Sequence, residues 1–166
     1  MALLTIAGGA LLLGHCVMAR EAAITIAWTL WILGTLGRLV TAIIIPYRLF
    51  THFEVREDPA FGDWLMPVVP PMVSAAIGAM LIPHASGIEL QHTMLYGCYA
   101  MFGVSLIVAM IIITLIWSRL AYSGTSGGAR VHKLWIILGP LGQSITAAGA
   151  LGTAALLVVD QPIATA

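Results

Sequence analysis

Apolar residues fill five long stretches of the chain, and short polar segments separate these stretches. A helix that crosses a membrane needs roughly 17 to 25 mostly apolar residues, at a rise of about 1.5 Å per residue. The pattern therefore predicts an all-α integral membrane protein. Its single transmembrane domain occupies residues 1–166, and its five expected helices are residues 2–18, 23–46, 64–83, 93–118 and 134–158.

The polar connections predict how these helices are oriented. The segments 47–63 and 119–133 together hold five of the seven basic residues, whereas the segment 84–92 has no lysine or arginine. Positively charged loops face the cytoplasm, so we expect loops 47–63 and 119–133 to be cytoplasmic in the plasma (inner) membrane. The chain enters its first apolar stretch at Ala2 and has an odd number of expected spans, so we expect an incomplete transporter domain.

Composition narrows the classes of partner. Hydrophobic residues make up 60% of the chain and charged residues only 8%, compared with about 25% charged in soluble domains, so lipid must cover most of the surface. The formal net charge is zero, which offers no electrostatic footprint for a nucleic acid. The expected partners are the lipid bilayer and a small anion substrate, without nucleic acid.

Three prolines stand near the start of the expected helix 64–83. Each interior proline removes one backbone donor, and in lipid a neighbouring helix, a hydroxyl group or water must satisfy the groups that are freed. The residues Pro67, Pro71, Ser74 and Gly78 fall on one helical face, with Pro70 beside them. We predict that this helix bends and lines an aqueous pathway; the alternative is a tight packing kink at a helix start.

The expected helix 134–158 contains a second proline and glycine break followed by polar side chains. Small residues on one stripe either let another helix approach closely or leave a bore open. Amide and hydroxyl groups at membrane depth need partners, so they favour a face toward protein or water. The candidate pathway residues here are Gly139, Pro140, Gly142, Gln143, Ser144 and Thr146.

Arg38 is the charged residue that lies well inside an expected span, 23–46. An arginine inside the membrane is a functional candidate, and we predict that it could contact an anion. Two structural alternatives stay open, because the side chain could reach the cytoplasmic face or pair with Glu54 or Asp58. The apolar composition of 23–46 favours an outer position facing lipid.

No pattern typical of an enzyme is present. The chain lacks a Ser/His/Asp set, an HExxH motif, a glycine-rich phosphate loop and a pair of intramembrane carboxylates. His52, His84, His92 and His132 stand at loops or span ends, which argues against haem ligation within the membrane. We therefore expect no catalytic residue, no metal and no cofactor.

Two segments carry a family resemblance. FGDWLMPVVPPMVSAAIGAMLIPH, from Phe61 to His84, and LWIILGPLGQSITAAGALG, from Leu134 to Gly152, resemble the tellurite-resistance/dicarboxylate transporter family, also called the voltage-dependent anion channel-like family. This resemblance implies ten spans in five hairpins, with kinked odd-numbered helices around a central pore, usually in trimers. The chain would then supply spans three to seven, without the ninth-span phenylalanine that closes the pore in channel members.

The expected function follows from the resemblance and the broken helices together. We expect transport of a small anion, such as a C4-dicarboxylate, sulfite, tellurite or a halide, through a pore lined by 2–18, 64–83 and 134–158. The family resemblance also implies a homotrimer. The alternative is a membrane assembly or interaction subunit without transport, or an inactive truncated fragment.

Overall fold

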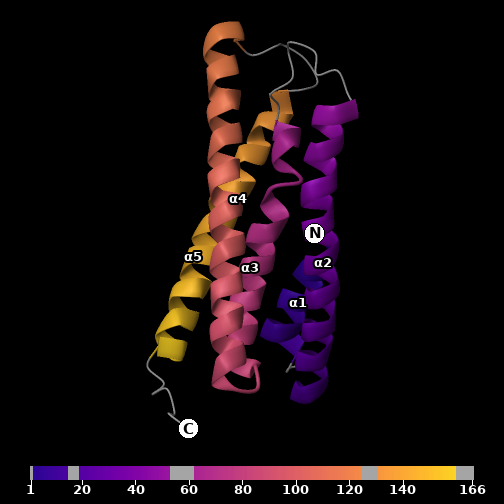
Figure 1. Ribbon diagram of the computed structural model, residues 1–166, viewed down its shortest axis with the longest axis vertical. Coiled ribbons are helices and arrows are strands. Elements are labelled where there is room, and N and C mark those ends of the chain that lie inside the picture. The colour runs from indigo at the N-terminus through magenta and orange to yellow at the C-terminus, as the bar shows by residue number, and fades with distance from the viewer. Residues whose placement is uncertain (1, 15–18, 53–61, 125–130, 160–166) are drawn as a thin grey trace.

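A computed structural model describes residues 2–14, 19–52, 62–124 and 131–159, and within these ranges every regular element is a helix (Figure 1). Five are α-helices, which confirms the predicted all-α fold with five helices. The α-helices are α1 (Ala2–Leu13), α2 (Arg20–His52), α3 (Val69–Leu81), α4 (Ile88–Ser123) and α5 (Leu138–Val159). Three 3₁₀ helices flank them: η2 (Gly62–Leu65), η3 (Ile82–His84) and η4 (Val131–Ile137).

Three segments are long and apolar enough to cross a membrane: Arg20–Arg48, Ile88–Tyr122 and Leu134–Val159. The other two apolar helical segments, Ala2–Leu13 and Val69–His84, are shorter. Of the spans predicted for 2–18 and 64–83, the second is interrupted, because its α-helix α3 covers only Val69–Leu81. In the first, α1 ends at Leu13, and residues 15–18 lie outside the described ranges.

Two predicted loops are shorter than expected because helices extend into them. Helix α2 continues through Pro46 to His52, so residues 47–52 are helical and do not belong to a loop 47–63. A proline costs the helix one hydrogen bond, and membrane helices tolerate this loss. Helix α4 reaches Ser123, so Arg119 also lies in a helix, and Gly124 ends that helix with a positive φ of 65°.

The turn between η3 and α4 depends on a glycine. Helix α4 begins at Ile88, so the predicted connection 84–92 is reduced to residues 85–87 between the two helices. Gly87 precedes Ile88 with φ 99° and ψ 142°, a backbone conformation that side chains disfavour. This glycine lets the chain reverse direction without a long loop.

Helix α3 occupies the centre of the elongated bundle, and α1, α2, α4 and α5 all pack against it (Figure 1). Every residue from Val69 to Ala79 is buried. Helices α2 and α4 instead carry many exposed large apolar side chains, among them Ile43, Val104 and Trp117. The outer helices thus present the surface suited to lipid, and α3 forms the interior.

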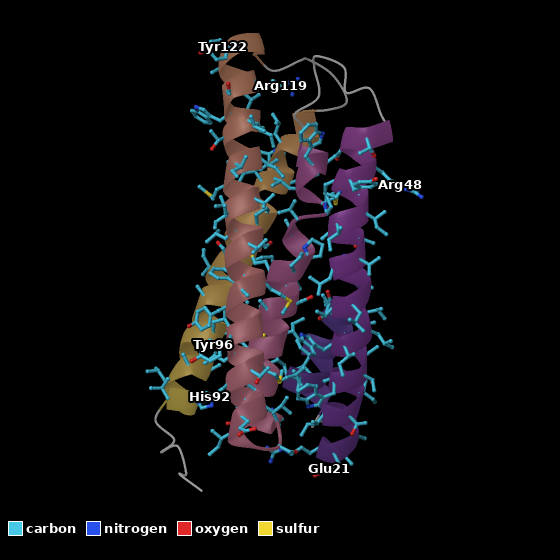
Figure 2. All side chains as sticks on the ribbon, viewed as in Figure 1. Glu21, Arg48, His92, Tyr96, Arg119 and Tyr122 are labelled. Atoms are coloured by element: carbon cyan, nitrogen blue, oxygen red, sulfur yellow. The ribbon has the colours of Figure 1, made fainter. Side chains whose placement is uncertain are left out.

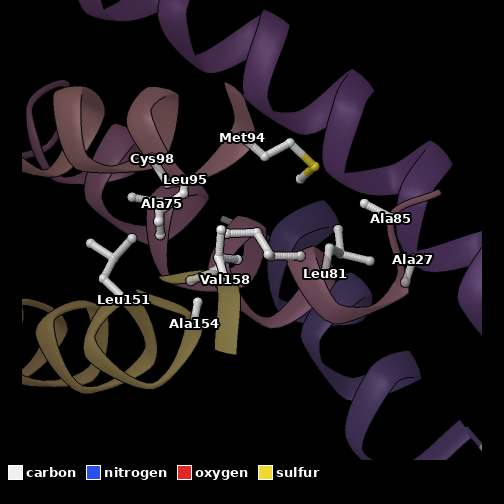
Figure 3. Packing of buried hydrophobic residues seen from close by; sticks show 12 residues of the cluster. Ala27, Ala75, Leu81, Ala85, Met94, Leu95, Cys98, Leu151, Ala154 and Val158 are labelled. Carbon is white, nitrogen blue, oxygen red and sulfur yellow. The ribbon is translucent and has the colours of Figure 1, made fainter. Parts of the chain in front are cut away.

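Small side chains allow the helices to approach one another in the largest buried cluster (Figure 3). This cluster joins α2, α3, α4 and α5. Most of its fully buried members are alanine, leucine or valine. Burial of their apolar surface stabilises the fold by about 25 cal/mol per Å². The residues shown include Ala27, Ala75, Leu81, Met94, Cys98, Leu151, Ala154 and Val158.

Gly78 marks the closest approach between α3 and its neighbours. A Cβ atom added there would lie 2.6 Å from the Sγ of Cys98 and 2.8 Å from Cζ2 of Trp31. Both distances are well below van der Waals contact. The missing side chain of Gly78 therefore lets α2 and α4 pack directly on α3.

We predict that Gly78→Ala destabilises the protein by about 1 to 3 kcal/mol, the usual cost of overpacking, because Cys98 or the Trp31 ring must move. The midpoint of thermal unfolding in detergent measures this effect. Gly97→Ala is the matched control, since Gly97 is exposed on α4 and has no atom within 4 Å of an added Cβ. Equal midpoints for the two variants would contradict the packing role of Gly78.

Candidate functional site

The helical conformation is interrupted immediately before α3. Helix η2 ends at Leu65, residues 66–68 form a turn, and α3 starts at Val69. Pro70 and Pro71 lie in the first turn of α3, where backbone N–H groups have no partner inside the helix in any case. The predicted single bent helix over 64–83 is therefore wrong in detail, because these prolines start α3 and do not kink it.

Side chains from two neighbouring helices hydrogen-bond to the backbone around this break. The Ser105 hydroxyl of α4 donates to the carbonyl oxygen of Val68, the residue that precedes α3. Six residues further along, inside α3, the carbonyl oxygen of Ser74 accepts a hydrogen bond at 2.8 Å from the indole N–H of Trp31 in α2. These hydroxyl and indole groups thus tie α4 and α2 to the backbone of α3.

A cavity of about 330 Å³ lies beside the break, between α1, α2 and the start of α3. Arg38 and Thr41 of α2 line it, together with Pro67 and Pro70. The structure therefore brings together three residues that the sequence predicted separately: Arg38, Pro67 and Pro70. No carboxylate, thiol or imidazole stands among the described residues of its lining, so the cavity presents a cationic group and offers no metal ligand.

Arg38 is half-buried and lies near the middle of α2. It stands 18 residues after Arg20 and 14 before His52, so more than about 20 Å of helix separates it from either end. Within the described residues no carboxylate pairs with its guanidinium, and the predicted alternatives Glu54 and Asp58 lie outside those residues. The guanidinium thus lies at the cavity, near the middle of a helix long enough to cross a membrane.

Sequence reasoning missed Gly37 and Thr41 as cavity residues. An added Cβ at Gly37 would have no atom within 4 Å, so the missing side chain contributes open space. The Thr41 hydroxyl donates to the carbonyl oxygen of Arg38 at 3.0 Å. The spacing of Gly34, Arg38 and Thr41 by four and three residues places them on one helical face, which could have indicated an inward-facing stripe.

Ser74 and Gly78 lie deeper in the bundle than the cavity. Ser74 is fully buried, and its hydroxyl has no hydrogen-bond partner among the described residues. Gly78 packs against Cys98 and Trp31, while Pro71 is buried next to Pro70. A role for Ser74, Gly78 and Pro71 in an aqueous pathway stays a prediction.

The candidate residues of α5 form a separate group. The 3₁₀ helix η4 changes to the α-helix α5 at Leu138, just before the predicted break, so 134–158 is not one uniform α-helix. Pro140 is buried and Gln143 and Ser144 are half-buried. The exposed members are Gly139, Gly142 and Thr146.

Two hydroxyl groups of α5 donate to their own helix. Ser144 donates to the carbonyl oxygen of Leu141 at 2.7 Å, and Thr146 donates to that of Gly142 at 3.1 Å. None of the α5 candidates is among the described residues that line the Arg38 cavity. The predicted role of α5 in the pathway therefore stays separate from the Arg38 site.

A sequence model for voltage-dependent anion channels matches residues 1–166. The chain belongs to the voltage-dependent anion channel family. The match confirms the resemblance carried by residues 61–84 and 134–152, and the members of this family are channels and transporters, not enzymes. The protein is therefore a multi-pass membrane protein of a transporter family.

Several characterised and uncharacterised transporters are similar to the chain. It is 28% identical over 123 residues to a sulfite efflux pump of Trichophyton rubrum, a match that covers 74% of this chain and 33% of the pump. A sulfite efflux pump of Arthroderma benhamiae matches with the same identity and coverage. An uncharacterized transporter of Methanocaldococcus jannaschii is 24% identical over 117 residues, covering 70% of this chain and 34% of that protein.

The matched segment spans about a third of the length of these relatives. No solved structure matches the chain.

We predict that Ser105→Ala destabilises the protein by about 1 kcal/mol, the net value of a typical intramolecular hydrogen bond, because Val68 loses its hydroxyl donor. The unfolding midpoint in detergent is again the measurement. Ser118→Ala on α4 is the control, since Ser118 is exposed on the same helix. A loss of stability as large in Ser118→Ala would show that the Val68 bond is not the cause.

Proposed function

We propose that this chain is part of a membrane transporter that moves a small anion along a route past Arg38. The observation that carries the proposal is the half-buried Arg38, which lines a cavity midway along α2 beside the broken start of α3. Membership of the voltage-dependent anion channel family supports the same function.

Electrostatics explains why such a residue suits transport. A central arginine costs a membrane helix about 2.5 to 3.5 kcal/mol by insertion scales, so its retention calls for a compensating interaction. A mobile anion in the cavity would provide one. The positive end of α3, which begins next to Pro67 and Pro70, adds partial charge directed at the same space.

These groups suit transient binding of a transported anion better than tight binding. Conduction needs binding that is favourable enough for an ion to enter and weak enough for it to leave. One guanidinium group and one helix end meet that need, because neither encloses the anion. The transported anion would therefore stay at the site only briefly.

Sulfite is the substrate that we propose first, because two similar fungal proteins are named sulfite efflux pumps. C4-dicarboxylates, tellurite and halides are the competing substrates. All are small anions that one guanidinium group could attract, so the described residues themselves do not separate them.

We further propose that α1, α3 and α5 lie on the inner side of a larger ring of helices. The exposed glycines of α5 support this arrangement, because no described atom lies within 4 Å of an added Cβ at Gly139, Gly142 or Gly149. Further spans, and a homotrimer of the complete protein, would complete the assembly. An assembly subunit without transport is the alternative, and it predicts no anion flux.

For orientation, we propose that the basic ends of α2 and α4 face the cytoplasm across the plasma membrane. Arg48 and Arg119 both lie toward the end of the bundle where α2 and α4 finish (Figure 2). Helices η2 and η4 pack together at that same end. The charge of this end supports the cytoplasmic assignment.

We predict that Arg38→Gln lowers sulfite flux about tenfold, because the cavity loses its positive charge at low dielectric. Flux is measured in proteoliposomes that contain the complete product of the reading frame encoding this chain. The control is Arg48→Gln, which removes the same charge from an exposed position near the end of α2. Equal flux in both variants and in the unmodified protein would remove Arg38 from the pathway.

We also predict that Gly37→Leu lowers the same flux, since a leucine side chain would occupy the open space of the cavity. Gly97→Leu places the same side chain at an exposed position of α4, where nothing lies within 4 Å of an added Cβ. Normal flux in both leucine variants would show that anions do not pass through this cavity. Absence of flux in the unmodified protein would favour the assembly subunit.

A reporter inserted at residue 125 tests the orientation. We expect alkaline phosphatase fused there to be inactive and green fluorescent protein fused there to fluoresce, because the segment 119–133 is predicted to be cytoplasmic. The same reporters inserted at residue 86, in the connection between η3 and α4, are the control and should give the opposite result. Active phosphatase at residue 125 would reverse the proposed topology.

A further inference from the structure

A second cavity of about 330 Å³ lies near the start of α2, apart from the Arg38 site. Arg20 and Ala23 of α2 line it, with Ala10 of α1 and His84 at the end of η3. At roughly 30 Å³ per water molecule, the cavity has room for about ten waters, or for a small anion that keeps part of its hydration shell. A permanently charged guanidinium group and an imidazole ring therefore share one space.

Arg20 supplies a permanent positive charge. It is the first residue of α2, its side chain is exposed, and no carboxylate pairs with it among the described residues. The neighbouring Glu21 is exposed and is not among the described residues that line the cavity. The first N–H groups of α2 also lack partners inside the helix, so they add partial positive charge at the same place.

His84 supplies a hydrogen-bond donor. Its side chain is half-buried, and its Nδ1 atom is buried without a hydrogen-bond partner among the described residues. Orphaned N–H groups are rarer in proteins than orphaned acceptors, so the neutral ring is expected to carry its hydrogen on Nε2. Nε2 is then the donor that a ligand in the cavity can use.

We propose that Arg20 and His84 form an anion-binding vestibule, where a small oxyanion such as sulfite binds at the opposite end of the transport route from Arg48. This inference rests on the proposed anion transport and adds a second site to it. Arg20 and Arg38 are separated by 18 residues of α2, or about 27 Å at the helical rise. The two sites would act in series, with the vestibule at the end opposite Arg48.

The position of the vestibule predicts a particular kinetic effect. A capture site raises the local anion concentration at one face of the membrane, and it does not change the slowest step further along. Loss of the Arg20 charge should therefore raise the sulfite concentration for half-maximal flux, with the maximal flux kept. The effect should appear only when sulfite is supplied from the side of the vestibule.

Sulfite flux into proteoliposomes of defined orientation, containing the complete product of the reading frame, tests this proposal. In Arg20→Gln and in His84→Ala we expect the half-saturating sulfite concentration to rise about fivefold, since one nearby charge and one hydrogen bond are each worth about that factor. In Arg20→Lys, which keeps the charge, we expect it to stay near normal. Arg48→Gln is the control, because it removes the same charge from an exposed position toward the opposite end of α2. Saturation curves that superimpose for all variants would overturn the vestibule while leaving the Arg38 proposal intact.

A binding measurement covers the case in which the unmodified protein shows no flux. In an Arg38→Gln background, added sulfite should still raise the unfolding midpoint of purified protein, and Arg20→Gln should abolish that rise. Such a result would support the vestibule although transport had failed. A sulfite-dependent rise that survives both Arg20→Gln and His84→Ala would overturn the vestibule.

Discussion

Hydrogen bonding of the backbone at the break before α3 is the constraint on which the rest of this structure depends. A transmembrane segment surrounded by lipid has no water to bind its free carbonyl groups, so an interrupted helix must be enclosed by protein. Ser105 of α4 and Trp31 of α2 supply donors to Val68 and Ser74. These two bonds join the central helix α3 to the long helices α2 and α4.

The same enclosure explains how closely the helices pack. An indole group can reach the backbone of α3 only if α2 approaches it, and Gly78 makes that approach possible. The cavity beside Arg38 then remains where glycine at position 37 leaves space that no neighbouring side chain fills. Gly78 of α3 thus allows close packing at Trp31 of α2, and Gly37 leaves open space six residues further along α2.

Much of the fold could be predicted from the sequence, because runs of apolar residues identify membrane helices directly. The positions at which the helices begin and end were less predictable. Pro46 was expected to end a helix and lies inside one, whereas Pro70 and Pro71 were expected inside a helix and begin one. A proline costs one hydrogen bond inside a helix and none in the first turn, so the residue type alone does not show which position it occupies.

The candidate site was predictable only in part. The position of Arg38 inside a span and the proline cluster both stood out, yet their meeting in one cavity depends on tertiary packing that no sequence spacing contains. Gly37 and Thr41 went unnoticed because 23–46 was interpreted as an outer, lipid-facing helix. Gly34 of this helix is buried, whereas Gly37 and Thr41 line the cavity from exposed positions.

The unequal lengths of the helices have a consequence for the energy barrier that an ion meets. Helix α3 has 13 residues and rises about 20 Å, while α2 has 33 residues and α4 has 36, each longer than a hydrocarbon core of about 30 Å. The outer helices α2 and α4 are therefore long enough to cross the lipid. In the proposed transport, an ion that follows α3 would be stripped of water over a distance smaller than the membrane is thick.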